Sequence, residues 1–295
     1  MATIRWRPGK TAAVVALLPT AVVVLLLFVG GTGWAALVSL TTSKMLANWN
    51  FTGFDQYVAL FNNPRWLTSL LNMLIFGVCF ISSSLVVGFL LAIFLDQKVK
   101  GESIFRTIYL YSYATSFIVA GLVWRWIFNP TLGLQDAVRD LGFENFTFDW
   151  IVDQQLAIFT IVIAAVWHGA GLVMVIALAG IRAVDEDIWK ALKVDGIPAW
   201  RAYLFVILPT VRSSIVTATV LMMIGVVRLY DVVVAMTNGG PGSATEVPAK
   251  FVVDNLFERQ NIALATAAST SLLALMLCLI IPYLLWQRAK KRDAE

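Results

Sequence analysis

The sequence predicts an all-α integral membrane protein with six transmembrane helices. Of its 295 residues, 59% are hydrophobic and 14% are charged, whereas an ordinary soluble domain has roughly 45–50% apolar and about 25% charged residues. Six apolar stretches are each long enough to cross a bilayer as a helix. Lysine and arginine gather at alternate ends of these stretches, which is typical of a multi-pass membrane protein.

The six predicted spans follow from the chemistry of the backbone. A helix needs about 20 predominantly apolar residues to cross the hydrocarbon core, where unsatisfied backbone groups find no partner. The stretches that meet this requirement are 12–40, 70–95, 107–128, 156–180, 211–236 and 264–286. The first stretch follows three basic residues, as in a signal peptide, but its length of over 25 residues favours a retained anchor. The third is polar in its first half, which indicates a helix facing protein or a water-filled cavity.

The orientation of the spans follows from the Lys and Arg residues that lie between them. The N-terminus, the second and fourth connections and the C-terminus hold fifteen, whereas the other connections hold five. We therefore expect residues 1–11 and 287–295 in the cytoplasm, and residues 12–286 as one membrane domain without internal repeats. The third connection, 129–155, carries five acidic residues and one arginine, as expected of a loop on the outer side.

The fourth connection, 181–210, is long and polar enough to form a small structure of its own. Three acidic residues, 185–187, precede a helical pattern, and acidic groups are favoured in the first turn of a helix. Gly196 and Pro198 are expected to end that helix, and a second short amphipathic stretch then leads to the fifth span. One interpretation is a helix lying on the lipid surface. The other is a knob that docks a partner on the cytoplasmic side.

This connection resembles the EAA motif of binding-protein-dependent ABC importer permeases. In that motif Glu-Ala-Ala, three residues, Gly, nine residues and Ile-x-Leu-Pro form a cytoplasmic coupling helix that docks into the ATPase. The residues that carry the resemblance are Ala191, Asp195, Gly196, Leu208 and Pro209. The sequence departs from the motif at Lys190, where the family usually has Glu, and at Leu192, where it usually has Ala. We therefore expect Trp189 and Leu192 to insert into the ATPase in place of an ion pair through Lys190.

Two further segments resemble carbohydrate-uptake permeases of the maltose and glycerol-phosphate type. WRWIFNPTLG, residues 124–133, is similar to the end of their third core helix, and TNGGPGSATE, residues 237–246, to the outward loop after the fifth. The resemblance runs from about residue 12 to the end of the chain. It implies a sugar-importer permease in the bacterial inner membrane, with an ATPase-coupling surface made of Trp189, Lys190, Ala191, Leu192, Asp195, Gly196, Leu208 and Pro209.

Such a permease needs partners, and the resemblance implies which ones. They are a second permease subunit, an ABC ATPase dimer and a periplasmic solute-binding protein, with membrane lipid around the spans and no nucleic acid. No GxxxxGK[ST] phosphate loop occurs in the sequence, so we expect ATP and Mg on the ATPase and no cofactor on this chain. Cys79 and Cys278 have neither metal-ligand spacing nor a disulfide pattern, and no catalytic or metal site is expected.

Charged residues inside a span call for an explanation, because each costs at least about 2.5–3.5 kcal/mol at the bilayer centre. Arg125 lies near the outer end of its span between two tryptophans, where its side chain can reach the interface. Arg228 and Asp231 are three residues apart on one predicted helical face, so they can pair. His168 is the only histidine, and it lies near the middle of the fourth span.

The resemblance implies that the fourth and fifth spans contact the solute. The corresponding residues are Trp167, His168, Gly169, Leu172, Arg228, Leu229 and Asp231. A buried structural ion pair and a satisfied histidine are the alternative interpretation. Two potential cations, His168 and Arg228, favour an anionic saccharide. If Asp231 pairs fully with Arg228, a neutral sugar suits the site equally well.

Two other classes of function compete with the importer. A secondary transporter or channel is expected to show internal repeats and no cytoplasmic docking knob. A membrane enzyme needs a nucleophile with its base, a group of carboxylates or a set of metal ligands, and none accompanies His168 in the sequence. Neither class explains the fourth connection.

Overall fold

The computed structural model describes residues 10–46, 48–97, 99–227 and 229–292. Parts of the predicted cytoplasmic termini, 1–11 and 287–295, therefore lie outside the described residues. The described chain is helical, apart from turns, loops and one isolated antiparallel bridge between Thr41 and Phe51. The all-α prediction is thus confirmed for this part of the chain. The chain divides into a terminal unit, up to Pro64 and from Phe251 onward, and a central unit, Arg65–Lys250.

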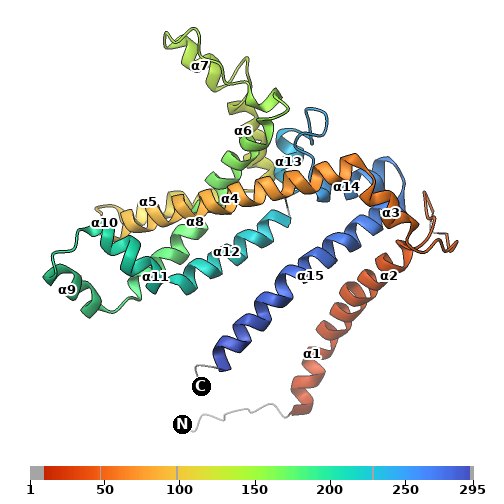
Figure 1. The fold of residues 1–295 in the computed structure, drawn as a ribbon, viewed down its shortest axis with the longest axis horizontal. Coiled ribbons are helices and arrows are strands. Elements are labelled where there is room, and N and C mark those ends of the chain that lie inside the picture. Colours follow the sequence, from red (N-terminus) through yellow and green to blue (C-terminus); the bar gives the residue numbers. More distant parts are fainter. Residues whose placement is uncertain (1–9, 47, 98, 228, 293–295) are drawn as a thin grey trace, which may run out of the picture. The chain divides into compact units, whose positions relative to one another are not determined.

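The terminal unit is built from the two ends of the chain (Figure 1). Its elements are α1 (Lys10–Val24), the π-helix η1 (Leu25–Gly30), α2 (Gly31–Val38), α3 (Asp55–Phe61), the π-helix η4 (Asp254–Glu258) and α15 (Ile262–Arg292). α15 packs against α2 and α3. The backbone N–H of Ala263 donates to the carbonyl oxygen of Ser43 at 2.8 Å, which ties the start of α15 to the loop after α2.

The central unit contains the segments in which the sequence placed function. Its elements are α4 (Pro64–Asp96), α5 (Glu102–Ala114), α6 (Phe117–Ile127), α7 (Leu134–Asp140), η2 (Trp150–Val152), α8 (Ala157–Arg182), α9 (Glu186–Val194), α10 (Ala199–Arg201), the π-helix η3 (Ala202–Ile207), α11 (Leu208–Thr210), α12 (Arg212–Val227) and α13 (Asp231–Met236). α14 (Pro248–Val253) follows at the boundary with the terminal unit. Figure 1 shows α9 projecting beside α10, and α7 projecting beyond α6.

Three helices among the described residues are apolar and long enough to cross a membrane without a break. They are Leu17–Val38, Pro64–Asp96 and Ala157–Arg182, and they correspond to the first, second and fourth predicted spans. Two bent pairs bring the number to as many as five. The last predicted span corresponds to a shorter apolar segment, Ile262–Cys278, at the start of α15.

The predicted third span is not one helix. α5 and α6 meet at an angle of 100°, and the backbone is extended at Thr115 and Ser116. Ser112 and Thr115 turn their hydroxyls back onto the carbonyl oxygens of Tyr109 and Tyr111, at 2.6 and 2.9 Å. Hydroxyls that bond the preceding turn in this way compete with the backbone and bend helices. The expectation of a continuous helix over 107–128 is therefore wrong.

The predicted fifth span is also interrupted. α12 ends at Val227 and α13 begins at Asp231, with a turn at Leu229 and Tyr230 between them. At its start, α12 makes an angle of 74° with the preceding helical segment, Ala199–Thr210. A continuous helix over 211–236 is therefore wrong.

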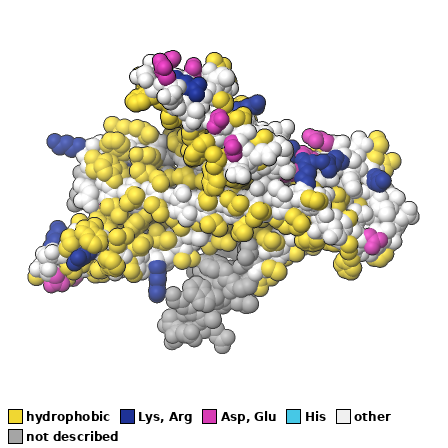
Figure 2. Space-filling model, turned by 45° about the horizontal axis from the view of Figure 1, so that its top comes forward, with side chains coloured by type: hydrophobic (Ala, Val, Ile, Leu, Met, Phe, Trp, Pro, Cys, Tyr) yellow, Lys and Arg dark blue, Asp and Glu magenta, His cyan; other side chains and the backbone are white. Residues whose placement is uncertain are grey.

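Most side chains that face outward from the long helices are apolar. Leu74, Val78 and Leu90 of α4 are 62%, 62% and 59% exposed. Figure 2 shows hydrophobic side chains over most of the visible face, with charged side chains gathered in small groups. A surface of this kind suits lipid or a protein partner better than water.

Close helix packing in the central unit depends on glycines of α8. A Cβ added to Gly171 would lie 2.1 Å from the carbonyl oxygen of Tyr109 in α5, and one added to Gly180 would lie 2.5 Å from the hydroxyl of Ser214 in α12. α8 is also the more buried of the two long helices of this unit, because 67% of its most apolar stretch is buried, against 33% for α4. Small residues at helix interfaces allow this approach of backbones within a membrane.

We expect Gly171→Ala to lower the thermal unfolding temperature of the purified protein in detergent. The new methyl group must push α5 away from α8, and overpacking of this kind costs about 1–3 kcal/mol. Gly225→Ala is the matched control, because its added Cβ would meet nothing nearer than the Phe80 ring at 3.9 Å. Equal unfolding temperatures for the two variants would contradict the close α5–α8 contact.

Candidate functional site

His168 lies on α8 and is 3% exposed. Its ring packs against the rings of Phe117 and Tyr113, with centroids 4.0 and 5.4 Å away. These aromatic residues flank the break between α5 and α6. Neither ring nitrogen of His168 has a hydrogen-bond partner among the described residues. A buried polar group without a partner costs about 1–3 kcal/mol, so His168 is a place where a ligand can supply the missing hydrogen bonds.

The other predicted residues of α8 surround His168 along the helix. Trp167 is 45% exposed, and its ring lies 5.9 Å from that of Trp124 on α6. Gly169 is buried, and a Cβ added there would lie 3.1 Å from the ring of Phe80 on α4. Leu172 packs against the hydrophobic core to which Phe80 belongs. The structure thus brings together a buried histidine, an exposed tryptophan and a glycine that brings α8 close to α4.

The predicted residues after α12 are arranged differently. Arg228 lies outside the residues that the structure describes, so its pairing with Asp231 stays a prediction. Leu229 is buried in the core with Val232 and Val233, whereas Asp231 is exposed at the first position of α13. No hydrogen bond joins Asp231 to His168 within the described chain. Leu229 is therefore a packing residue in this structure.

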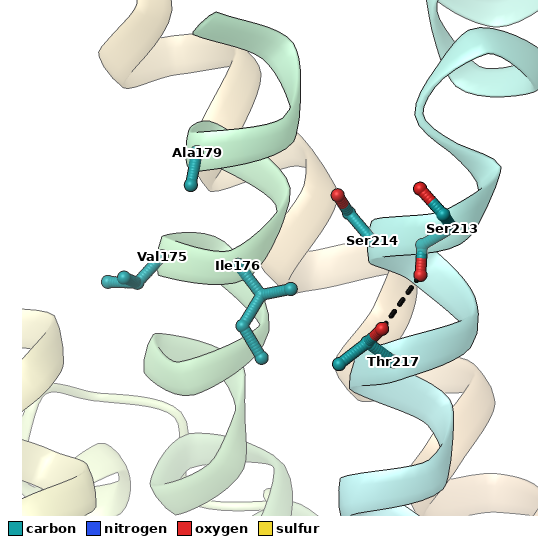
Figure 3. A pocket seen from close by; sticks show the side chains of 6 residues that line it. All are labelled: Val175, Ile176, Ala179, Ser213, Ser214 and Thr217. Carbon is teal, nitrogen blue, oxygen red and sulfur yellow. Dashed lines mark hydrogen bonds between the residues drawn. The ribbon is translucent and has the colours of Figure 1, made fainter. Parts of the chain in front are cut away.

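A pocket of about 360 Å³ lies between α8 and α12, and the sequence analysis did not single it out (Figure 3). Its walls are Val175, Ile176 and Ala179 of α8 and Ser213, Ser214 and Thr217 of α12. None of the predicted solute-site residues lines it. The sequence signal that could have found it is the group of three hydroxyls in the first turns of an apolar span.

The fourth connection folds as the sequence predicts at both ends of α9. The side chain of Asp185 accepts a hydrogen bond from the backbone N–H of Asp187 at 2.9 Å, which caps the first turn. At the other end, Gly196 has a φ of +66°. Ile197 N–H donates to the carbonyl oxygen of Leu192 at 3.1 Å, and Gly196 N–H to that of Lys193 at 3.2 Å. This pair of bonds is a Schellman motif, which closes a helix at a glycine.

The inward face of α9 contradicts the prediction that Leu192 inserts into the ATPase. Leu192 is 7% exposed and packs in a core with Tyr203 and Ile207. The Trp189 ring also contacts that of Tyr203, with centroids 5.4 Å apart. The expectation that Leu192 inserts into a partner is therefore wrong, because this side chain already lies inside the chain's own core. Trp189 is half-buried against the same core.

The outward face of α9 is polar with one exposed apolar residue. Lys190 Nζ lies 2.8 Å from Asp187 Oδ1, and these two side chains are 67% and 82% exposed. Ala191 and Asp195 are exposed, and Val194 is 86% exposed. The usual glutamate of the motif is thus replaced by a lysine that pairs within its own helix.

The end of the motif lies on the following helical segment. Leu208 is half-buried at the start of α11, and Pro209 is exposed. A hollow of about 370 Å³ lies between the end of α9 and this segment, lined by Asp195, Gly196, Ile197, Pro198, Arg201, Phe205 and Val206. The connection therefore presents a polar helix, a hollow and a proline together on its exposed side.

Comparison with known proteins identifies the family to which the chain belongs. The chain matches the family described as binding-protein-dependent transport system inner membrane component over residues 84–293. A probable ABC transporter permease protein of Pyrococcus horikoshii is 34% identical over 255 residues, which are 86% of this chain and 87% of that protein. The xylose/arabinose import permease protein of Haloferax volcanii is 30% identical over 262 residues, 88% of this chain and 82% of that protein.

A solved structure has the same fold. It is the crystal structure of a bacterial ABC transporter involved in the import of the acidic polysaccharide alginate. One of its chains aligns with a TM-score of 0.79 and 16% identity, over 93% of this chain and 95% of that chain. The chain belongs to the family of binding-protein-dependent transport system inner membrane components and is a multi-pass permease subunit of an ABC importer.

Proposed function

We propose that this chain and a second permease subunit form the membrane pathway of an ATP-driven importer for a sugar or sugar derivative. The observation that carries the proposal is the family match over residues 84–293 on a chain of long apolar helices. The relative from Haloferax volcanii is named for xylose and arabinose, which supports a saccharide. The importer would contain an ABC ATPase dimer, where ATP and Mg bind, and a periplasmic solute-binding protein. The six spans would leave both termini in the cytoplasm.

The fourth connection, 181–210, would be the contact with the ATPase, with α9 as the coupling helix. Its inner face packs in a hydrophobic core that it shares with α4, α8 and η3, whereas its outer face is exposed. The Schellman motif at Gly196 ends the helix. A short rigid helix of this kind can transmit the closure of the ATPase to the spans. Trp189, Lys190, Ala191, Asp195, Gly196, Leu208 and Pro209 would form or support this contact.

The solute would pass beside His168 and the break between α5 and α6. Trp167, Trp124 and Tyr113 supply aromatic faces there, and sugar sites combine such faces with a few polar groups. His168 can donate one hydrogen bond and accept another when it is neutral. Gly169 and Leu172 would shape this region from α8. The resemblance implies that Arg228, Leu229 and Asp231 also belong to the solute site, although Leu229 packs in the core in this structure.

The assembly and its solute can be tested together. The chain is expressed together with whatever permease, ATPase and binding-protein genes are found beside its own gene, and it is purified through a tag on this chain. Co-purification of an ATPase and a second permease is expected. A panel of neutral, phosphorylated, sulfonated and uronic saccharides is then titrated onto the binding protein. Purification of the tagged chain without any ATPase would sink the proposal.

We expect Gly196→Asp to abolish solute uptake while leaving the amount of the protein in the membrane unchanged. The substitution places an L-residue at positive φ, which costs roughly 1–2 kcal/mol, and adds a carboxylate to the face offered to the ATPase. Gly53→Asp is the matched control, because Gly53 has a φ of +65° and equally open space around it but lies outside the connection. Uptake by Gly196→Asp that equals wild type would refute the coupling role.

Lys190→Ala and Trp189→Ala separate charge from packing on α9. Lys190 makes an exposed ion pair, and such pairs contribute at most about 1 kcal/mol, so its loss should be mild. Removing the Trp189 ring uncovers Tyr203 and loosens α9. Truncating a fully buried ring costs about 3–5 kcal/mol, and this half-buried ring should cost a substantial part of that. ATPase co-purification and uptake should therefore fall sharply for Trp189→Ala alone. The reverse order would show that charge dominates this contact.

His168→Leu tests the solute site once the solute is known. The substitution removes both ring nitrogens from a buried aromatic setting, so the protein should fold as well as wild type. A lost hydrogen bond of about 1.4 kcal/mol corresponds to a tenfold loss, and we expect at least that reduction in uptake. His168→Gln, which keeps a donor and an acceptor, should retain more activity.

Arg228→Gln tests whether a cation in the pathway favours an anionic solute. Unchanged uptake of an anionic solute would remove Arg228 from the site.

A further inference from the structure

The hydroxyl of Tyr203 joins the fourth connection to the end of α4. It donates a hydrogen bond to Asp96 Oδ2 at 2.7 Å and accepts one from Gln97 Nε2 at 2.9 Å. Tyr203 is 5% exposed. Asp96 is the last residue of α4. One side chain from η3 therefore holds two consecutive residues where a membrane helix ends.

The ring of Tyr203 has a second role on its other side. It packs edge-on against Trp189 of α9, and it shares a core with Leu192 and Leu95. α9 thus touches Tyr203 through its inward face, and Tyr203 touches α4 through its hydroxyl. A packed protein interior has low compressibility and passes on displacements. A continuous path of contacts runs from α9 to α4 through this one residue.

A separate bridge joins the neighbouring helix ends. Arg182 Nη2 at the end of α8 lies 2.9 Å from Glu102 Oε2 at the start of α5, and it donates to the carbonyl oxygen of Leu95 at 3.5 Å. The ends of α4, α5 and α8 are therefore held together without Tyr203. The connection to α9 is the additional contact that Tyr203 supplies.

We propose that Tyr203 is the positioning residue that makes α9 and the end of α4 move as one body. The inference rests on the proposed function, because the ATPase is what displaces α9. Without the hydroxyl, α9 would follow the ATPase while α4 lags behind, and ATP hydrolysis would proceed with less effect on the spans. The residue contacts neither solute nor nucleotide and acts through Asp96 and Gln97.

Pulsed electron paramagnetic resonance on the assembled importer in lipid vesicles tests this directly. Spin labels are placed at Leu90→Cys on α4, which is 59% exposed, and at Glu186→Cys in the exposed first turn of α9, outside the residues proposed to contact the ATPase. Cys79 and Cys278 are first changed to Ser. Adding ATP and Mg should leave the label distance unchanged in the otherwise wild-type chain. In Tyr203→Phe, which keeps the ring packing, the distance should shift or broaden. Unchanged distances in both chains would overturn the proposal, and so would a shift in both.

Phosphate release measured with and without the binding protein gives the functional readout. Its stimulation by the binding protein should fall by at least about 2- to 10-fold in Tyr203→Phe, because the loss of even one of the two hydrogen bonds of this hydroxyl produces about that factor. Tyr57→Phe is the matched control, since it removes a hydroxyl that bonds Ser39 Oγ at 2.7 Å in the terminal unit. Asp96→Asn keeps an acceptor and should resemble wild type, whereas Asp96→Leu should resemble Tyr203→Phe.

The outcomes separate the two claims. If the wild-type chain binds no ATPase, the proposed function fails and this inference falls with it. If the complex forms and hydrolyses ATP but Tyr203→Phe matches wild type in both readouts, only the role of Tyr203 is refuted. A fall in stimulation for Tyr57→Phe equal to that for Tyr203→Phe would also refute it.

Discussion

The central unit depends on the close approach of α8 to its neighbours. In hydrocarbon each backbone polar group must be satisfied within the protein, so helices associate there by close packing and not by water exclusion. Gly171 brings the backbone of α8 against the carbonyl of Tyr109, and Gly180 brings it against Ser214. These contacts hold α8 between the bent pair α5–α6 and α12. The histidine and the fourth connection are both placed by this one helix.

Breaks in the neighbouring helices are permitted because α8 is continuous beside them. The extended residues Thr115 and Ser116 interrupt the ladder of backbone bonds between α5 and α6, and a bilayer tolerates such a break only where it is covered by protein or lines a cavity. His168, with both ring nitrogens unpartnered among the described residues, lies beside the two rings that flank this break. The polar backbone of the break and the polar side chain of His168 therefore lie close together within an otherwise apolar unit.

The sequence predicted the features that depend on composition and local chemistry. It did not predict the features that depend on contacts with other helices. Apolar length identified three unbroken spans, and the positive φ of Gly196 ends α9 as expected. The breaks at residues 115–116 and 229–230 were missed, because apolar periodicity is uninformative where almost every residue is apolar. Leu192 was given to a partner and belongs to the chain's own core. An amphipathic pattern shows which face is covered, but not what covers it.

α8 connects the two regions on which transport would depend. From His168 to Arg182 it runs 14 residues without a break, or about 21 Å at 1.5 Å per residue. An unbroken helix packed by glycines cannot shorten or slide without separating these contacts, so a displacement at Arg182 would reach His168 as a tilt or shift of the whole helix. The bent pairs on either side can change their angles at the breaks. A rigid helix between hinged neighbours is thus the arrangement by which a movement at the connection can alter the surroundings of a buried histidine.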